Sequence, residues 1–424
     1  MKWLPTLFAA EAIPSAMITF VALLMFLQLG VGWERSTLFC ALLTLPWMMK
    51  SWVRSSLRRW GHFVWQLRLA EVLTFLSLVA LAFSFTARTD RLLWVFLSLF
   101  VLCLCTAWHE LVARMYYEQR LRRPQQRFYS GQKMFFTQSG VVLTYGVMIV
   151  VVGSLEVFFH HRSHAITESW STAVYLLAGV YLCLLLWNLV SLSHSSSPVE
   201  GGVAVNETNL SPLPNRGGVW GGAFSLFILL LPQALLFHAR VLYLFASQSE
   251  GGLGCSLQWI GLAQGTVGVI AFSAGLIWGY QMLRRQRASI DVSCPQLFKF
   301  VIPLGLSPLV YWLMTQYPPA NLFWLCVATG TAQFCFGFGL NGCSLFLRHL
   351  FGERYAGTIN YLFVPLISLV MLPAMAASGW LVARLGFEQF FTLNALLALP
   401  AWLAGYIGWT NIASHPSHQF PSLP

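Results

Sequence analysis

The sequence predicts an all-α polytopic membrane protein that crosses a bilayer twelve times. Of the 424 residues, 57% are hydrophobic and 9% are charged, and mean hydropathy is +0.66. A soluble core of this size cannot bury that much apolar surface. Apolar stretches of roughly 20 residues, the length that spans a bilayer, follow one another along the chain. Arginines gather at every second connection between them, as expected for successive crossings in opposite directions.

Twelve stretches are long and apolar enough to form membrane helices. Lys2 is followed by one such stretch without a small-residue cleavage site, so the first helix is expected to act as an uncleaved insertion signal. By the rule of roughly 20 apolar residues the spans lie at 7–29, 36–53, 66–85, 92–116, 130–155, 172–192, 220–246, 257–282, 297–314, 322–347, 357–383 and 389–410.

Helix-breaking residues are frequent inside these spans. Proline removes an intrahelical hydrogen bond, and glycines four residues apart let two helices approach closely. Bent and closely packed helices suit a protein that opens on alternate sides, and they also occur in ordinary membrane packing. The residues concerned are Pro14, Pro46, Pro232, Pro303, Pro308, Pro365, Pro373 and Pro400, with Gly265, Gly268, Gly275 and Gly279 in the eighth span.

The arginine-rich connections predict which side of the membrane each loop occupies. Short cytoplasmic loops retain Lys and Arg, so these connections and both chain termini are expected in the cytoplasm. The net charge of +11 is therefore assigned to topology and to anionic lipid headgroups, and no nucleic-acid partner is expected. The arginines are Arg54, Arg58, Arg59, Arg120, Arg122, Arg123, Arg127, Arg284, Arg285, Arg287, Arg348 and Arg354.

One connection differs from the others in composition. Residues 193–218 are rich in Ser, Pro, Gly and Asn and offer little to bury, which predicts a flexible cytoplasmic linker. The linker divides the chain into an N-terminal six-helix bundle at 1–192 and a C-terminal one at 219–412, with a tail at 413–424. Two bundles of six helices are the arrangement of the major facilitator fold, in which solute binds between the halves near the bilayer midplane. Hydropathy alone also permits other twelve-span folds, including those with broken helices.

Four ionisable side chains inside spans are the candidates for proton coupling: Glu11, His109, Glu110 and Arg114. Such groups are costly in a membrane and normally face a cavity or a partner. Glu110 and Arg114 are four residues apart and share a helix face, so Glu110 either takes up and releases a proton or forms a fixed ion pair. His109 either titrates near neutrality or hydrogen-bonds between helices. Glu11 faces the central cavity or reaches the headgroups.

Uncharged polar residues inside spans are the candidates for solute contact. Each could instead hydrogen-bond a neighbouring helix, which is the commoner use of such residues in membrane proteins. The candidates are Gln132, Gln138, Gln333, Asn341 and Asn360.

Motifs of soluble enzymes are absent from the sequence. The chain has no GxxxxGK[ST] phosphate loop, no GxSxG elbow and no HExxH pair. The nine cysteines show no metal-ligand spacing, so neither a metal site, a cofactor nor a disulfide framework is expected. The sequence therefore does not predict an enzyme.

Several blocks resemble the muropeptide permease (AmpG-type) branch of the major facilitator superfamily. The segment WHELVARMYYEQRLRRPQQRFYSGQKMFF is similar to a block with a His-Asp pair, an aromatic pair and a Gln-Gln turn. Four more segments resemble further blocks of the branch, in the same order: FAAEAIPSAMITFVALLMFLQLGV, LPWMMKSWV, EGGLGCSLQWIGLAQGTVGVIAFSAGLIWG and QFCFGFGLN. In the segment that begins at Trp108, the matching residues are His109, Glu110, Tyr116, Tyr117, Gln125 and Gln126. Arg114 stands where the branch carries a second acid.

The resemblance implies a divergent secondary transporter of the cell inner membrane, working as a monomer by alternating access. It implies a small or medium-sized organic solute, such as a cell-wall fragment or glycopeptide, moved in symport with protons through Glu110 and His109. Two alternatives stay open at this point. One is a polytopic membrane transferase that uses His109 as a base, and the other is a transport-dead sensor or assembly partner.

Overall fold

The computed structural model describes residues 3–49, 53, 57, 60–87, 89–193, 216–286, 294–351 and 356–413. All regular elements in these ranges are helices. Of the predicted linker, residues 194–215 lie outside the described residues, as does the tail from 414 onward. The predicted topology arginines Arg54, Arg58, Arg59, Arg287 and Arg354 also lie outside them.

Ten helical segments in the described residues are long and apolar enough to cross a membrane. This makes the chain a helical protein with many membrane spans, as predicted. The segments are Trp3–Gln28, Phe63–Ser84, Arg91–Arg120, Phe128–Phe158, Ala165–Leu192, Gly221–Phe245, Leu257–Arg285, Leu297–Gln316, Leu322–Leu347 and Met371–Thr410.

Twelve spans were predicted, and ten segments of span length are found in the described residues. Two of the expected spans do not form a separate apolar helix of that length. The span expected at 36–53 forms two shorter helices, α3 (Trp33–Leu43) and α4 (Leu45–Met48), with Pro46 in the first turn of the second. The last two expected spans fall together in α16 (Ala356–Leu396) and α17 (Ala398–Ala413). Within α16, Gly386 has a φ of 76° and a ψ of 165°, which breaks the helix there. Twelve crossings stay a prediction.

The chain divides into two compact units. The first is Met1–Glu207 with Gly254–Thr266, and the second is Thr208–Leu253 with Val267–Pro424. The helices of the first unit are α1 (Trp3–Ala16), η1 (Met17–Val21), α2 (Ala22–Gln28), α3, α4, α6 (Phe63–Ser84), α7 (Arg91–Arg120), α8 (Arg123–Val141), η2 (Val142–Val147), α9 (Met148–Phe158), α10 (Ala165–Ser193) and α12 (Leu257–Ile260).

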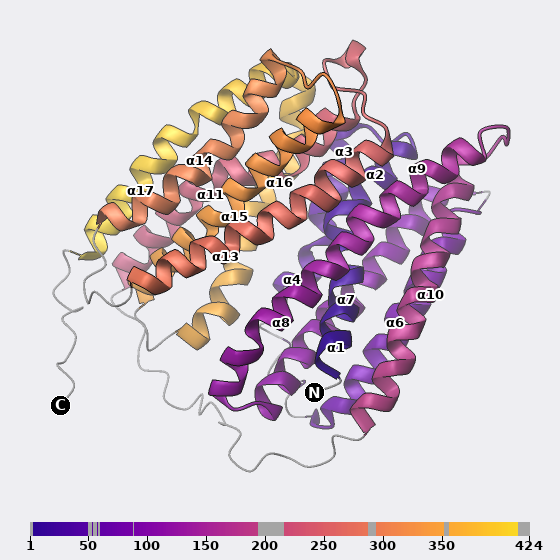
Figure 1. Ribbon diagram of the computed structural model, residues 1–424, viewed down its shortest axis with the longest axis horizontal. Helices are drawn as coiled ribbons and strands as arrows, with labels where there is room; N and C mark the ends of the chain where they lie inside the picture. Colours follow the sequence, from indigo (N-terminus) through magenta and orange to yellow (C-terminus); the bar gives the residue numbers. More distant parts are fainter. Residues whose placement is uncertain are drawn as a thin grey trace. The chain divides into compact units, whose positions relative to one another are not determined.

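Helices α1, α6, α7, α8 and α10 form the part of the first unit that carries its buried charged groups. Helix α6 packs between α7 and α10, and α1 packs against α7, α8 and α10 (Figure 1). Helices α1 and α8 are so close that a Cβ atom on Gly140 would lie 2.7 Å from the Cβ atom of Ala12. Apolar residues of α1 and α7, including Leu7, Phe8, Val112 and Tyr116, form the adjoining core. Two ionisable side chains on these helices, Glu71 and His109, are buried within the protein.

Within the described residues, the first unit contains two π-helical segments and most of a third, whose residues up to Thr266 belong to it. These are η1, η2 and η5 (Gly261–Gly268). The rings of Phe20 in η1 and Tyr145 in η2 stack with centroids 5.1 Å apart. A Cβ atom on Gly265 in η5 would overlap the carbonyl oxygen of Tyr145. Only glycine at this position allows the two backbones to come so close.

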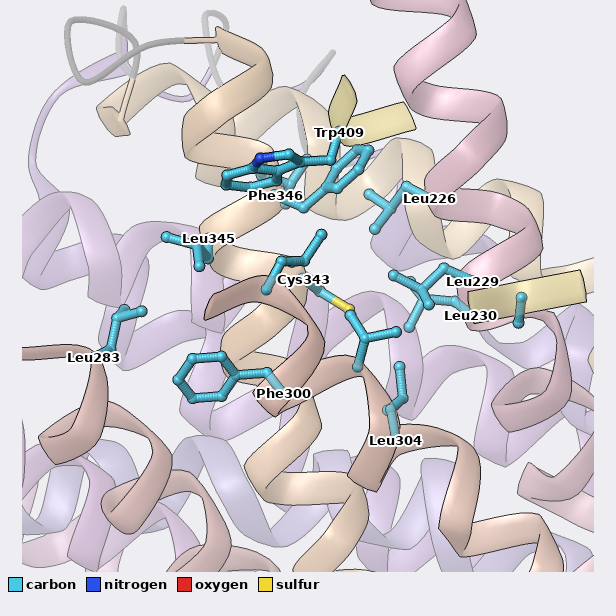
Figure 2. Packing of buried hydrophobic residues seen from close by; sticks show 14 residues of the cluster. Leu226, Leu229, Leu230, Leu283, Phe300, Leu304, Cys343, Leu345, Phe346 and Trp409 are labelled. Carbon is cyan, nitrogen blue, oxygen red and sulfur yellow. The ribbon is translucent and has the colours of Figure 1, made fainter. Parts of the chain in front are cut away.

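The second unit has its own hydrophobic core. It is built from α11 (Arg216–Phe245), α13 (Val269–Gln286), α14 (Cys294–Gln316), α15 (Leu322–Phe351), α16 and α17, with the short 3-10 turn η4 (Gln248–Glu250). Figure 2 shows Phe300, Phe346 and Trp409 among leucines from α11, α13 and α14. Side-chain donors also join these helices: Gln233 donates to the carbonyl oxygen of Leu304 at 2.6 Å, and Trp402 to that of Val301 at 3.0 Å.

Candidate functional site

A charged group surrounds Lys133 in the first unit. The Lys133 Nζ atom lies 4.5 Å from the centroid of the Phe8 ring on α1 and 5.6 Å from that of the Tyr117 ring on α7. The two rings meet edge to face with centroids 5.6 Å apart. An ammonium held over aromatic faces gains about 0.5–2 kcal/mol. Lys133 is thus placed by two helices other than its own.

Carboxylates from two helices act on the same ammonium. Glu11 on α1 and Glu110 and Glu118 on α7 are its acidic electrostatic neighbours, and Arg114 is its basic one. Glu110, Arg114 and Glu118 follow one another at four-residue spacing, so one face of α7 presents all three. Five charged side chains of mixed sign are therefore gathered within span-length apolar helices, and we call them the Lys133 group.

A second polar group is fully buried between α6, α7 and α10. His109 Nε2 lies 3.3 Å from Glu71 Oε1, and Asn188 Nδ2 donates to the same oxygen at 2.7 Å. Glu71 and Asn188 are 0% exposed and His109 is 1% exposed. A buried carboxylate is costly unless it is hydrogen-bonded and compensated, so these three residues depend on one another. We call them the Glu71 triad.

The structure separates two residues that are neighbours in sequence. His109 belongs to the Glu71 triad, whereas Glu110 acts on Lys133. Successive helical residues point about 100° apart, so the two side chains reach different neighbours. Glu11 and Arg114 lie with Glu110 in the Lys133 group. The predicted coupling residues thus fall into two groups, and α7 contributes to both, through His109 to one and through Glu110 and Arg114 to the other.

The predicted solute-contact residues lie on three helices, α8 in the first unit and α15 and α16 in the second. On α8, Gln132 is exposed and Gln138 is half-buried. On α15, Gln333 and Asn341 are buried. Asn341 donates to the carbonyl oxygen of Leu276 on α13 at 3.3 Å. This is a hydrogen bond between two helices, which is the alternative to solute contact for such a residue. Asn360 lies in α16, and its side chain is outside the described residues.

Two residues central to these groups escaped the sequence analysis. Glu71 lies inside the third expected span, where an ionisable side chain signals a partner as strongly as it does at Glu110. Lys133 lies near the start of the fifth span, where it is easily taken for one more basic residue of the preceding arginine-rich connection. In the described residues no three His, Cys, Asp or Glu side chains gather in a way that could hold a metal ion.

Solved structures share this fold over nearly the whole chain. A point mutant of the nucleoside transporter NupG superposes with a TM-score of 0.70 at 12% identity, covering 96% of this chain and 99% of its own. A bacterial homolog of the human lysosomal transporter Spinster, inward-facing and unoccupied, gives 0.66 at 13% identity, covering 97% and 96%. The xylose transporter XylE from E. coli, inward open, gives 0.63 at 10% identity, covering 94% of each chain.

These likenesses define the class of the protein by its fold. It is a helical, multi-span membrane protein with the fold of the major facilitator transporters, and the similar structures are transporters rather than enzymes. No protein-family model matches the sequence, and no curated protein matches it. The resemblance to the muropeptide permease branch stays a prediction.

Proposed function

We propose that this protein is a secondary transporter that moves a small or medium-sized polar organic solute across a cell inner membrane by alternating access. The observation that carries the proposal is the Lys133 group. Charged side chains inside span-length helices are expensive and mark solute or ion pathways. They occur here in a chain that follows a transporter fold over 96% of its length.

The proposal includes twelve crossings in two six-helix bundles, with both termini in the cytoplasm and a single chain as the working form. The break at Gly386 supports two crossings in place of the single segment Met371–Thr410. The α3 and α4 segment supplies the remaining one. The positions of the arginines support the orientation, because cytoplasmic loops retain them.

The charges of the Lys133 group favour a solute with hydrogen-bonding or charged groups. Nucleosides and xylose, the cargo named for NupG and XylE, have this character. A cell-wall fragment or glycopeptide, which the sequence resemblance implies, has it as well. Gln132 and Gln138 lie on the same helix as Lys133 and are proposed to contact the solute, with Gln333, Asn341 and Asn360 contributed by the second unit.

Proton symport is proposed to run through α7. Glu110 acts on Lys133 together with Glu11 and Glu118, and Arg114 lies among the same charges. Charged groups gathered inside span-length helices mark proton and solute pathways, and His109 is next to Glu110 in the sequence.

The proposal is tested by uptake into proteoliposomes under an imposed pH gradient. Labelled uridine, xylose and a muropeptide serve as solutes, and protein-free vesicles give the background. Glu110→Gln is expected to abolish gradient-driven uptake while leaving solute exchange at equal pH intact. Glu168→Gln, which removes an acid paired with Arg162 at the start of α10, is the matched control and is expected to behave as wild type. Unaltered gradient-driven uptake in Glu110→Gln would remove Glu110 from the coupling role.

A further inference from the structure

The Glu71 triad contains polar atoms that its own hydrogen bonds do not satisfy. Within the described part of the chain, Glu71 Oε2, Asn188 Oδ1 and His109 Nδ1 are buried and make no hydrogen bond. A buried acceptor left unsatisfied costs about 1–3 kcal/mol. Two of these three atoms are oxygens on groups already joined to each other, because Asn188 Nδ2 donates to Glu71 Oε1.

One proton accounts for both oxygens. An amide and a carboxyl joined through one N–H···O bond can close a second bond between their remaining oxygens only when the carboxyl carries its proton. Glu71 Oε2–H would then donate to Asn188 Oδ1, and Glu71 Oε1 would accept from Asn188 Nδ2 and from His109 Nε2–H. In this state Glu71 and His109 are both neutral.

Loss of the proton leaves a carboxylate in the same place. The His109 and Asn188 donors still reach its Oε1 atom, so the charged form keeps two hydrogen bonds. Arg68, one turn before Glu71 on α6, donates from Nη2 to the carbonyl oxygen of Leu189 at 3.1 Å and adds positive charge near the triad. The site thus has partners for the charged form as well as for the neutral one.

The other titratable groups around the triad come from every helix packed against it. On α10, Tyr181 is an electrostatic neighbour of Glu71 and lies close to Thr74. On α7, Cys105 lies 3.9 Å from the Ser77 hydroxyl of α6, and Glu110 follows His109 directly. Helix α1, which packs against α7 and α10, carries Glu11. Among these titratable groups, the Glu71 carboxyl is the one whose oxygen contacts both His109 Nε2 and Asn188 Nδ2.

We infer that the Glu71 triad is a proton-binding site, in which Glu71 takes up one proton, Asn188 holds the protonated carboxyl, and His109 supports its charged form. Loading forms one O–H bond with a proton from water, and unloading returns that proton to water. The inference rests on the proposed function, because it makes this site a carrier of the coupling proton. It assigns that role to Glu71 on α6, whose carboxyl contacts His109 on α7.

Infrared difference spectroscopy of the purified full-length protein in lipid vesicles tests the inference, with the proton itself as the probe. The C=O stretching band of a protonated carboxyl is expected to grow as the pH is lowered. Glu71→Gln, which mimics the neutral form in shape, is expected to remove one component of the band, and Glu110→Gln, which removes a different carboxyl, is expected to leave that component in place. Exchanging sodium for choline at fixed pH is expected to leave the band unchanged.

A second variant guards against a misfolded Glu71→Gln protein. Asn188→Leu keeps the size of the side chain but removes both hydrogen bonds between the amide and Glu71. The Glu71 component of the band is therefore expected to move to higher frequency. A band unaltered in both variants overturns the inference, as does one present at every pH or one that responds to sodium. No solute is needed for this measurement. A titrating band without any uptake would refute only the transport function, and uptake without a titrating band would refute only the site.

Discussion

His109 Nε2 lies 3.3 Å from Glu71 Oε1, although the two residues are 38 positions apart in sequence and both side chains are buried. Replacing His109 by Ala removes one of the two donors to that oxygen. A buried acceptor that loses its partner costs about 1–3 kcal/mol, so His109→Ala is expected to lower the thermal unfolding midpoint in detergent. His160→Ala, at an exposed position after α9, is the control. Equal midpoints for the two variants would show that the contact does not stabilise the fold.

Lys133 is expected to stabilise the first unit through the acids around it. Lys133→Met leaves Glu11, Glu110 and Glu118 without this ammonium, so the unfolding midpoint is expected to fall. Adding Glu11→Gln removes one of the carboxylates and is expected to restore part of the loss, because the two residues interact. Gradient-driven uptake by Lys133→Met is expected to fall about tenfold or more, which corresponds to about 1.4 kcal/mol. Strictly additive effects of the two substitutions on stability would contradict this account of the group.

The close approach of η5 to η2 is expected to tolerate no side chain at Gly265. A methyl group there would overlap the Tyr145 carbonyl oxygen, which is backbone and cannot move aside cheaply. Overpacking of this kind costs about 1–3 kcal/mol, so Gly265→Ala is expected to reduce folded yield and lower the unfolding midpoint. Gly179→Ala on α10, where the new carbon would meet nothing within 4 Å, is expected to match wild type. Similar midpoints for the two variants would exclude the tight crossing.

The thiol of Cys255, in the segment before α12, is expected to react slowly at neutral pH. Burial raises its pKa from 9.0 to about 11. With the other cysteines replaced, alkylation by iodoacetamide is expected to rise through about pH 11 in the folded protein and through about pH 9 in the urea-unfolded one. The raised pKa stabilises the fold below pH 9, and this contribution is lost as the pH rises from 9 toward 11. Coincident alkylation curves would show that the thiol is not buried.

The orientation of the chain in the membrane is tested by single cysteines in a cysteine-free background. Ser163 lies in the connection after α9, which the proposed topology places outside the cytoplasm, and Gln119 lies at the end of α7, which it places inside. Both positions are exposed. A membrane-impermeant maleimide is expected to label Ser163→Cys in intact cells and Gln119→Cys only after lysis. The reverse pattern would place both termini outside.

The general fold was predictable because a bilayer constrains a sequence strongly. A span needs a long apolar run, so composition and length indicated a many-helix membrane protein, and the similar solved structures confirm that class of fold. The exact number of crossings was not confirmed, because α3 and α4 are short and Gly386 interrupts a continuous helical segment. The π-helical segments left no readable signal, since widened turns depend on packing around Gly265 and Tyr145 rather than on composition.

The candidate site was only partly predictable, because sequence spacing describes one helix and the partners come from others. The spacing of Glu110 and Arg114 placed both residues on one helix face. Both act on Lys133, which lies on another helix. Lys133 is their neighbour because α1, α7 and α8 pack together, and the sequence does not show this packing. His109 was singled out, but Glu71 and Asn188 are its partners only through the contacts of α6 with α7 and α10. The roles of Glu11 and of the polar residues on α8 and α15 stay predictions.

The most direct measurement of coupled transport records proton and solute movement together. Proteoliposomes containing a trapped pH-sensitive dye receive uridine, xylose or a muropeptide outside, without an imposed gradient. We predict that a transported solute acidifies the interior of vesicles containing the wild-type protein, and that Glu71→Gln and Glu110→Gln admit the solute without acidification. Solute entry through the wild-type protein with no change of internal pH, or no entry of any solute above protein-free vesicles, would contradict proton-coupled transport.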